Sequence, residues 1–123
     1  MTRPIKDILL KDMQAKVNGS LWLESGGKHF LGPGPVELLE RIAETGSISN
    51  AAKEMKMSYK KAWEIVNRLN EHMAAPVVIP QAGGEKGGGS TLTPEALELI
   101  KYHHQLRKRF AAFLKKESKR LGI

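Results

Sequence analysis

The sequence predicts an α+β fold that is mainly α-helical, and three observations lead to that expectation. Apolar residues recur at helical spacing in three successive segments between residues 35 and 73. The pattern changes to two short strands around a glycine-rich loop within residues 77–92. A strong helix start then opens a last helical segment over residues 94–118. The 123 residues suffice for one core, because a chain of this length buries roughly two-thirds of its surface on folding.

Residues 1–32 are expected to form an arm and a β-hairpin within the same domain as the rest of the chain. Residues 1–15 mix charged and aliphatic side chains without strong caps, which favours a weak arm or a short helix. Apolar residues alternate from Lys16, the turn sequence Gly26-Gly27 follows, and the pattern resumes at residues 29–31, as is typical of a hairpin. Residues 32–35 alternate glycine and proline, so we expect them to form a linker that ends at Pro35, the first position of a helix.

Three helices are predicted in close succession after this linker. The first covers residues 35–44, and its apolar face consists of Val36, Leu38, Leu39, Ile42 and Ala43. Gly46 lies just past its end, and Ser47 is suited to cap the second helix, residues 48–55. Ser58 is suited to cap the third helix, which extends to about residue 73. Its inward face consists of Ala62, Ile65, Val66, Leu69 and Met73.

The second and third helices form a predicted helix-turn-helix motif, because a tight connection separates them. Ala51 and Ala52 permit a close crossing of the two helices. Lys56 occupies the turn position that often holds glycine, and we expect an ordinary α conformation to tolerate it there. Together with the hairpin that follows, residues 33–123 are predicted to form a winged helix-turn-helix domain with a long C-terminal dimerisation helix.

The strands at residues 77–79 and 90–92 are interpreted as the wing. The loop between them does not match the phosphate-binding pattern GxxxxGK[ST], so a nucleotide site is not expected. Glycines let a backbone approach DNA closely, and Lys86 could reach a phosphate or the minor groove. A loop that makes no contacts is the alternative.

The third helix is expected to read DNA, because polar and basic side chains suited to base edges and phosphates fill its first turns. A solvated, lysine-rich helix face is the alternative interpretation. Trp63 is expected to pack at the base of the helix. The candidates for DNA contact are Ser47, Ser49, Ser58, Tyr59, Lys60, Lys61, Glu64, Asn67, Arg68 and Lys86.

The last helix is expected to form a homodimer. It starts at Thr93-Pro94-Glu95, a capping hydroxyl followed by proline and an acid, and its 94–118 span is about 37 Å long, too long for so small a core. Apolar residues and one histidine recur along it at three- to seven-residue steps, as in a helix pair. A purely core role is the alternative. The candidates for the dimer seam are Leu99, His103, Leu106, Phe110 and Phe113.

Charge and composition narrow the possible partners. The net charge of +7 divides into 0 over residues 1–45, +2 over residues 46–92 and +5 over residues 93–123. Such a balance favours nucleic acid or an anionic membrane. With no cysteine, no HExxH spacing and no pairing of nucleophile with base, we expect no metal, no cofactor and no enzymatic activity. No apolar run reaches the roughly 18 residues of a membrane span and no signal peptide is visible, so a cytoplasmic protein without membrane contact is expected.

Three blocks of the sequence resemble the N-terminal DNA-binding domain of the ModE family of molybdate-responsive regulators. They are residues 38–42 together with 46–52, residues 57–63, and the glycine-rich segment at residues 83–89 with Leu92-Thr93. The arrangement is more distantly similar to the winged helix of LysR-type regulators. The resemblance covers about residues 16–118 and implies a homodimeric regulator of transcription, with molybdenum-related target genes. Family members bind molybdate in C-terminal domains, and this chain ends where they would begin, so molybdate sensing is not expected and the effector stays open.

The leading hypothesis is therefore a homodimeric, sequence-specific regulator that binds double-stranded DNA. The alternative is a stand-alone winged-helix module that modulates another regulator through the C-terminal helix.

Overall fold

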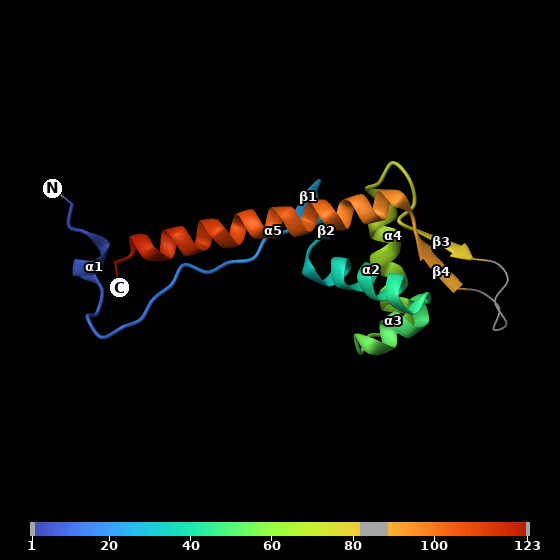
Figure 1. Cartoon of the computed structure of the whole chain (residues 1–123), viewed down its shortest axis with the longest axis horizontal. Helices are drawn as coiled ribbons and strands as arrows, with labels where there is room; N and C mark the ends of the chain where they lie inside the picture. Colours follow the sequence, from blue (N-terminus) through green and yellow to red (C-terminus); the bar gives the residue numbers. More distant parts are fainter. Residues whose placement is uncertain (1, 82–88, 123) are drawn as a thin grey trace. The chain divides into compact units, whose positions relative to one another are not determined.

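The computed structural model describes residues 2–81 and 89–122, which form two compact units. Trp22–His103 make up the larger unit, and Met1–Leu21 together with His104–Ile123 make up the smaller one. Figure 1 shows the order of the elements along the chain. They are α1 (Ile5–Ile8), β1 (Leu23–Ser25), β2 (Lys28–Leu31), α2 (Pro33–Thr45), α3 (Ile48–Glu54), α4 (Tyr59–Glu71), β3 (Val78–Gln81), β4 (Gly89–Leu92) and α5 (Pro94–Arg120).

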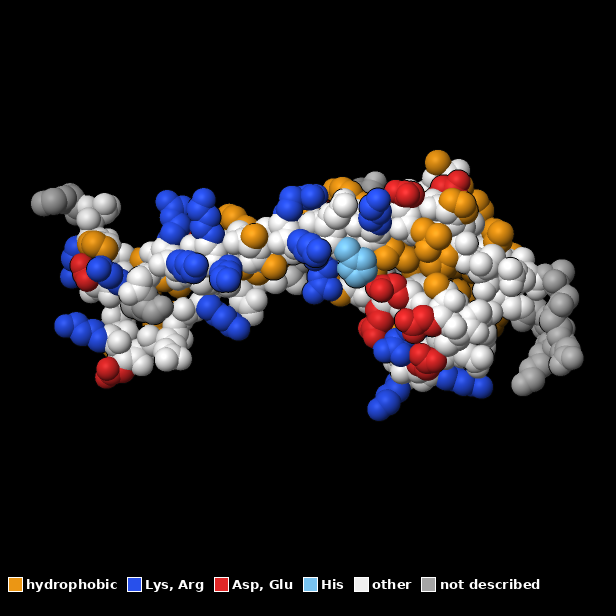
Figure 2. Space-filling view, in the orientation of Figure 1, with side chains coloured by type: hydrophobic (Ala, Val, Ile, Leu, Met, Phe, Trp, Pro, Cys, Tyr) orange, Lys and Arg blue, Asp and Glu red, His pale blue; other side chains and the backbone are white. Residues whose placement is uncertain are grey.

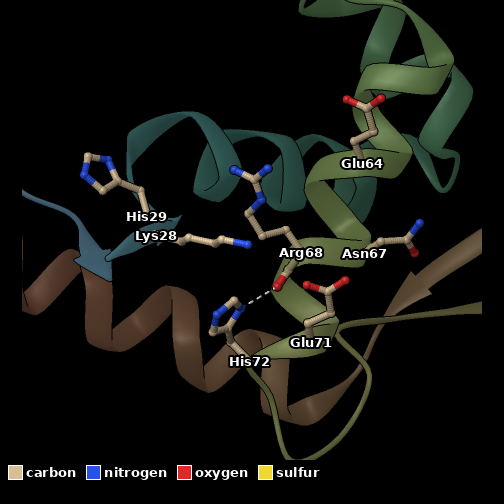
Figure 3. A pocket seen from close by; sticks show the side chains of 7 residues that line it. All are labelled: Lys28, His29, Glu64, Asn67, Arg68, Glu71 and His72. Carbon is tan, nitrogen blue, oxygen red and sulfur yellow. Dashed lines mark hydrogen bonds between the residues drawn. The ribbon is translucent and has the colours of Figure 1, made fainter. Parts of the chain in front are cut away.

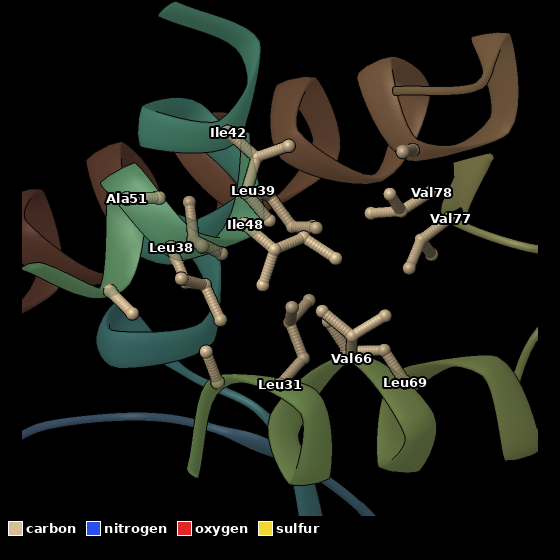
Figure 4. Packing of buried hydrophobic residues seen from close by; sticks show 14 residues of the cluster. Leu31, Leu38, Leu39, Ile42, Ile48, Ala51, Val66, Leu69, Val77 and Val78 are labelled. Atoms are coloured by element: carbon tan, nitrogen blue, oxygen red, sulfur yellow. The ribbon is translucent and has the colours of Figure 1, made fainter. Parts of the chain in front are cut away.

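The core of the larger unit lies among α2, α3 and α4, with contributions from both hairpins (Figure 4). Apolar side chains from α2 and α4 meet there, as the helical spacing predicted. One member of the predicted apolar faces, Ala43, is exposed and lies outside this core. Met73 lies past the end of α4 at Glu71 and is half-buried against the core. The largest fully buried apolar residues are Leu31, Leu38, Leu39, Ile42, Val66, Leu69 and Val77.

Helix α2 begins two residues earlier than the sequence predicted, so the linker expected at residues 32–35 is largely helical. Gly32 is its N-cap and Pro33 its first residue, and the Val36 N–H donates to the Gly32 carbonyl at 3.1 Å. Pro35 therefore lies at the third helical position. The first N–H groups of a helix have no partner within it, so a proline in that turn sacrifices no hydrogen bond.

The turn between α3 and α4 has a conformation that the sequence analysis misjudged. The Met57 N–H donates to the Ala52 carbonyl at 3.0 Å, and the Lys56 N–H donates to the Lys53 carbonyl at 3.1 Å. These two bonds form a Schellman motif, in which the residue after the cap adopts the left-handed conformation. Lys56 is that residue, with φ of +56°, so the expected α conformation at Lys56 is wrong.

Two ion pairs of the Arg41 guanidinium connect α2 with α3. Arg41 donates to the Glu37 carboxylate at 2.9 Å within α2 and to the Glu54 carboxylate at 2.9 Å on α3. The hydrogen bond to Glu37, followed by that to Glu54, raises the pKa of Arg41 above its ordinary value. An arginine is charged across the neutral range in any case, and these two hydrogen bonds link the two helices.

The N-terminal hairpin belongs to the larger unit through its second strand. Strands β1 and β2 pair antiparallel around Gly26 and Gly27, whose φ angles of +58° and +78° suit a tight hairpin turn. The ladder is shorter than the predicted alternation from Lys16, because regular pairing begins only at Leu23. Leu31, at the end of β2, is 1% exposed and joins the core. This burial fixes the hairpin against the helices.

The second hairpin, β3 and β4, occupies the predicted position of the wing. Val78 pairs with Leu92 and Gln81 with Gly89. The Ser90 N–H donates to the Gly46 carbonyl oxygen at 2.8 Å, which joins β4 to the end of α2. The rest of the glycine-rich loop, including Lys86, lies outside the described residues.

Helix α5 starts where the sequence predicted, because Thr93 caps it. Its hydroxyl accepts the Ala96 N–H at 3.2 Å and donates to the Pro76 carbonyl at 2.7 Å. The helix ends at Arg120, two residues beyond the predicted end. None of the described helices has both the length and the apolar character needed to cross a bilayer.

The smaller unit pairs the N-terminal arm with the C-terminal part of α5. The Val17 N–H donates to the Ser118 Oγ at 2.8 Å, across 101 residues of sequence. Gly19 lies against the Phe110 ring, where a Cβ would come within 3.3 Å of a ring carbon. Residues 9–21 therefore follow this part of the helix without forming a strand (Figure 1).

Candidate nucleic-acid interface

Serine side chains set the starts of α3 and α4. The Ser47 Oγ accepts the Asn50 N–H at 3.1 Å, and the Ser58 Oγ accepts the Lys61 N–H at 3.0 Å. Both caps confirm the predicted helix starts. Each hydroxyl keeps its own proton, which remains able to donate to a phosphate oxygen.

Helix α4 is anchored by one face and leaves the other to solvent. Ala62, Val66 and Leu69 are fully buried on the inner face. Anchoring of this kind holds the outer side chains in a fixed direction, which a groove-binding helix requires. On α3, the candidate Ser49 is exposed and the candidate Ser47, its N-cap, is half-buried. Every candidate for DNA contact in α4 and at its N-cap is exposed. These candidates are Ser58, Tyr59, Lys60, Lys61, Glu64, Asn67 and Arg68.

Two aromatic residues mark the start of α4. Tyr59 is 54% exposed, and its ring meets Trp63 edge to face with centroids 6.2 Å apart. Trp63 is half-buried and packs against the core, as the sequence predicted. Trp63 thus supports Tyr59, which is left with its hydroxyl at the surface.

A hollow of about 710 Å³ lies where the N-terminal hairpin meets the outer face of α4 (Figure 3). Three of its residues, Glu64, Asn67 and Arg68, are among the candidates for DNA contact predicted from the sequence. The others were not predicted, because no local pattern shows that a hairpin packs beside the end of α4. The lining residues are Lys28, His29, Glu64, Asn67, Arg68, Glu71 and His72.

The predicted dimer seam divides into buried and exposed positions. His103 is 1% exposed, so its assignment to the seam is wrong: the ring is buried within its own chain and has almost no surface left to bury against a partner. Leu99 is half-buried and packs against the core. Leu106 and Phe110 are half-buried, and Phe113 is 54% exposed. The surface still available to a second chain therefore centres on the later positions of α5.

Basic side chains dominate the surface of the C-terminal half of α5 (Figure 2). They are exposed, in accord with the charge of +5 over residues 93–123. Within the described residues, no group of three or more His, Cys, Asp or Glu side chains is arranged to hold a metal ion. The exposed basic residues of the whole of α5 are Lys101, Arg107, Lys108, Arg109, Lys115, Lys116, Lys119 and Arg120.

Residues 35–97, about half of the chain, match the family described as bacterial regulatory helix-turn-helix protein, lysR family. The chain belongs to this family. The match begins at the third residue of α2, spans α3, α4 and the described part of the wing, and ends in the first turn of α5. The expectation of a winged helix-turn-helix fold is confirmed.

Curated relatives carry the resemblance further. The molybdenum-pterin-binding protein MopB of Rhodobacter capsulatus is 42% identical over 93 residues, which cover 76% of this chain and 34% of that protein. The DNA-binding transcriptional dual regulator ModE of Escherichia coli is 38% identical over 94 residues, covering 76% of this chain and 35% of that protein. The ModE resemblance is thereby confirmed, and the chain spans about a third of the length of these relatives.

A solved structure supports the fold alone. A mutant of ZitR from Lactococcus lactis superposes with a TM-score of 0.51 at 18% identity, over 85% of this chain and 70% of that one.

Proposed function

We propose that this chain is a sequence-specific DNA-binding regulator of transcription that acts as a homodimer. The observation that carries the proposal is the outer face of α4, a capped and core-anchored helix with exposed polar and basic side chains, in a chain of the lysR family. In helix-turn-helix proteins the second helix of the motif lies in the major groove, with its first residues nearest the bases. Helix α4 occupies that position in this motif.

The side chains of α4 supply complementary contacts. Lys60 and Lys61 pair with phosphates or with the O6 and N7 acceptors of guanine. Glu64 can accept from the cytosine N4 amino group, and Asn67 can bind adenine at N6 and N7. Ser47, Ser49, Ser58, Tyr59 and Arg68 contact the phosphate backbone and fix the register, and in this proposal Lys86 of the wing reaches the adjoining backbone or minor groove.

Homodimerisation through α5 places one α4 helix on each half-site. Half-sites one helical turn apart, about 34 Å, or a multiple of that distance, match a two-fold protein. The seam in this proposal centres on Leu106, Phe110 and Phe113, because these residues retain exposed apolar surface. Relatives with molybdenum in their names make molybdenum-related genes the proposed targets. The proposal assigns no effector to the chain and places it in the bacterial cytoplasm.

Selection from random-sequence duplexes tests DNA recognition. The wild-type chain should enrich a pseudo-palindromic duplex, and Lys60→Ala should bind it more weakly by fluorescence anisotropy. The slope of log K against log salt should flatten by about 0.9 for each phosphate contact removed. Lys101→Ala, on the exposed surface of α5, is the control. Failure to enrich any duplex, or unchanged binding by both Lys60→Ala and Lys61→Ala, would show that α4 does not read DNA.

Sedimentation equilibrium tests the dimer. Phe113 is exposed in the single chain, so Phe113→Asp should leave the fold intact and shift the population toward monomer. Lys115→Asp is the control. Because residues two positions apart point to nearly opposite sides of a helix, Lys115 lies away from the seam that contains Phe113. An unchanged mass for Phe113→Asp would remove this seam from the proposal.

A further inference from the structure

We propose that the hollow between the N-terminal hairpin and α4 binds a phosphate group of the DNA backbone, at the edge of the surface that reads the bases. This inference rests on the proposed function and extends it to the hairpin. The hollow of about 710 Å³ is far larger than one phosphate ion fills, and it opens beside the helix proposed to enter the groove. Its size and place suit a stretch of nucleic-acid backbone.

Two cationic side chains from different elements share this hollow. Lys28 extends from the start of β2 toward Arg68, which projects from the outer face of α4 (Figure 3). Within the described residues, neither side chain forms a salt bridge, although Glu64 and Glu71 line the same hollow. The charges of Lys28 and Arg68 are balanced over the whole hollow by Glu64 and Glu71, so a bound anion gains only where it lies nearer to the two cations than to the two carboxylates. A phosphate is such an anion, and Arg and Lys are its usual partners in DNA complexes.

Ring stacking holds the hairpin in place at this edge. Phe30 of β2 stacks on His72 at the end of α4, with centroids 4.4 Å apart and planes inclined by 4°. His29 stacks on Trp22 with centroids 4.2 Å apart, and its Nε2 lies 3.4 Å from the Glu24 carboxylate. The hairpin therefore presents Lys28 from a supported position, and a positioned cation loses less freedom on binding than a mobile one.

The hollow lies toward the C-terminal end of α4, away from the first residues of the helix, which are proposed to contact the bases. Arg68 lies eight residues beyond Lys60, or about 12 Å along the helix axis. The first residues of a recognition helix approach the bases, so the later residues approach the wall of the groove, where the phosphates lie. The His72 Nδ1–H donates to the Arg68 carbonyl oxygen at 2.8 Å, which holds the ring at the end of α4. The hairpin thus widens the footprint on the backbone without adding contacts to bases.

The test compares Lys28→Ala with the wild type on the selected duplex. One lost phosphate contact should flatten the slope of log K against log salt by about 0.9. If the wild type and the variant bind equally when extrapolated to 1 M salt, the variant should bind about eightfold more weakly at 0.1 M salt. The base preference obtained by repeating the selection should stay unchanged. Lys28→Arg should restore the slope, and Lys101→Ala should match the wild type. Ethylation of one flanking phosphate per half-site should hinder the wild type and not Lys28→Ala.

Each contrary outcome has a distinct meaning. Wild-type affinity and salt slope in Lys28→Ala, together with weakened binding by Lys60→Ala, would overturn the phosphate site and leave the proposed function standing. A changed base preference in Lys28→Ala would overturn it too, because the hairpin would then touch bases. Saturable binding of inorganic phosphate that Lys28→Ala abolishes, with unchanged DNA affinity, would identify a small-ion site instead. If the wild type enriches no duplex, both proposals fail.

Discussion

Replacing Lys56 with glycine should stabilise the larger unit. Lys56 adopts φ of +56°, a conformation that costs an L-residue about 1–2 kcal/mol relative to the right-handed helix. Glycine removes that cost, but its greater conformational freedom in the unfolded chain destabilises the folded state by about 0.5–1 kcal/mol. The difference is a net gain of about 0.5–1 kcal/mol. The Lys56 side chain is exposed, so its loss should leave no cavity.

Thermal and denaturant unfolding at one protein concentration measure this gain. For the larger unit, Trp22–His103, an unfolding entropy of about 2.1 cal/mol/K per residue converts this gain into a rise of the unfolding midpoint by about 3–6 °C. Lys56→Ala controls for the loss of the side chain, because alanine keeps the backbone cost. Lys53→Gly, in the last turn of α3, should instead destabilise by about 0.5–1 kcal/mol. If Lys56→Gly were no more stable than Lys56→Ala, the assigned backbone strain would be refuted.

Two further outcomes concern the wing and α5. In Gly89→Ala the new Cβ would lie 2.9 Å from the Gly46 carbonyl oxygen, so β4 must shift. We therefore expect this variant to bind the selected duplex more weakly. Gly34→Ala is the control, because its new Cβ would meet nothing within 4 Å. Binding equal to that of the control would show that the wing needs no such fit. Thr93→Val should lower the unfolding free energy by about 1–2 kcal/mol in denaturant titration, because it removes the helix cap and the bond to the Pro76 carbonyl. Recovery by Thr93→Ser is expected, and an equal loss in that variant would assign the effect to packing.

The sequence predicted correctly those features that depend on interactions between residues a few positions apart. Ser47, Ser58 and Thr93 cap the three helices they were expected to cap, because a capping bond joins residues only three positions apart. The inner face of α4 follows from helical spacing in the same way. These signals placed the helix-turn-helix motif and the exposed candidates for DNA contact.

The turn at Lys56 shows why a local pattern can still mislead. A Schellman turn imposes a left-handed residue whatever its side chain, and glycine is only the least costly choice. The packing of α3 against α4 and the bonds at Ala52 and Lys53 determine this turn. The lysine was therefore compatible with two backbone conformations until the crossing of the helices was known.

The helices of the motif, the strands of the wing and the polar face of α4 follow from the sequence, since caps, glycines and periodicity act within a few residues. The stacking of Phe30 on His72, the hollow shared by Lys28 and Arg68, and the burial of His103 became visible only in the folded chain. These arrangements join residues far apart in the chain, or bury a polar side chain that the helical pattern had assigned to a dimer. Their stability comes from packing of surfaces that no local window of sequence contains.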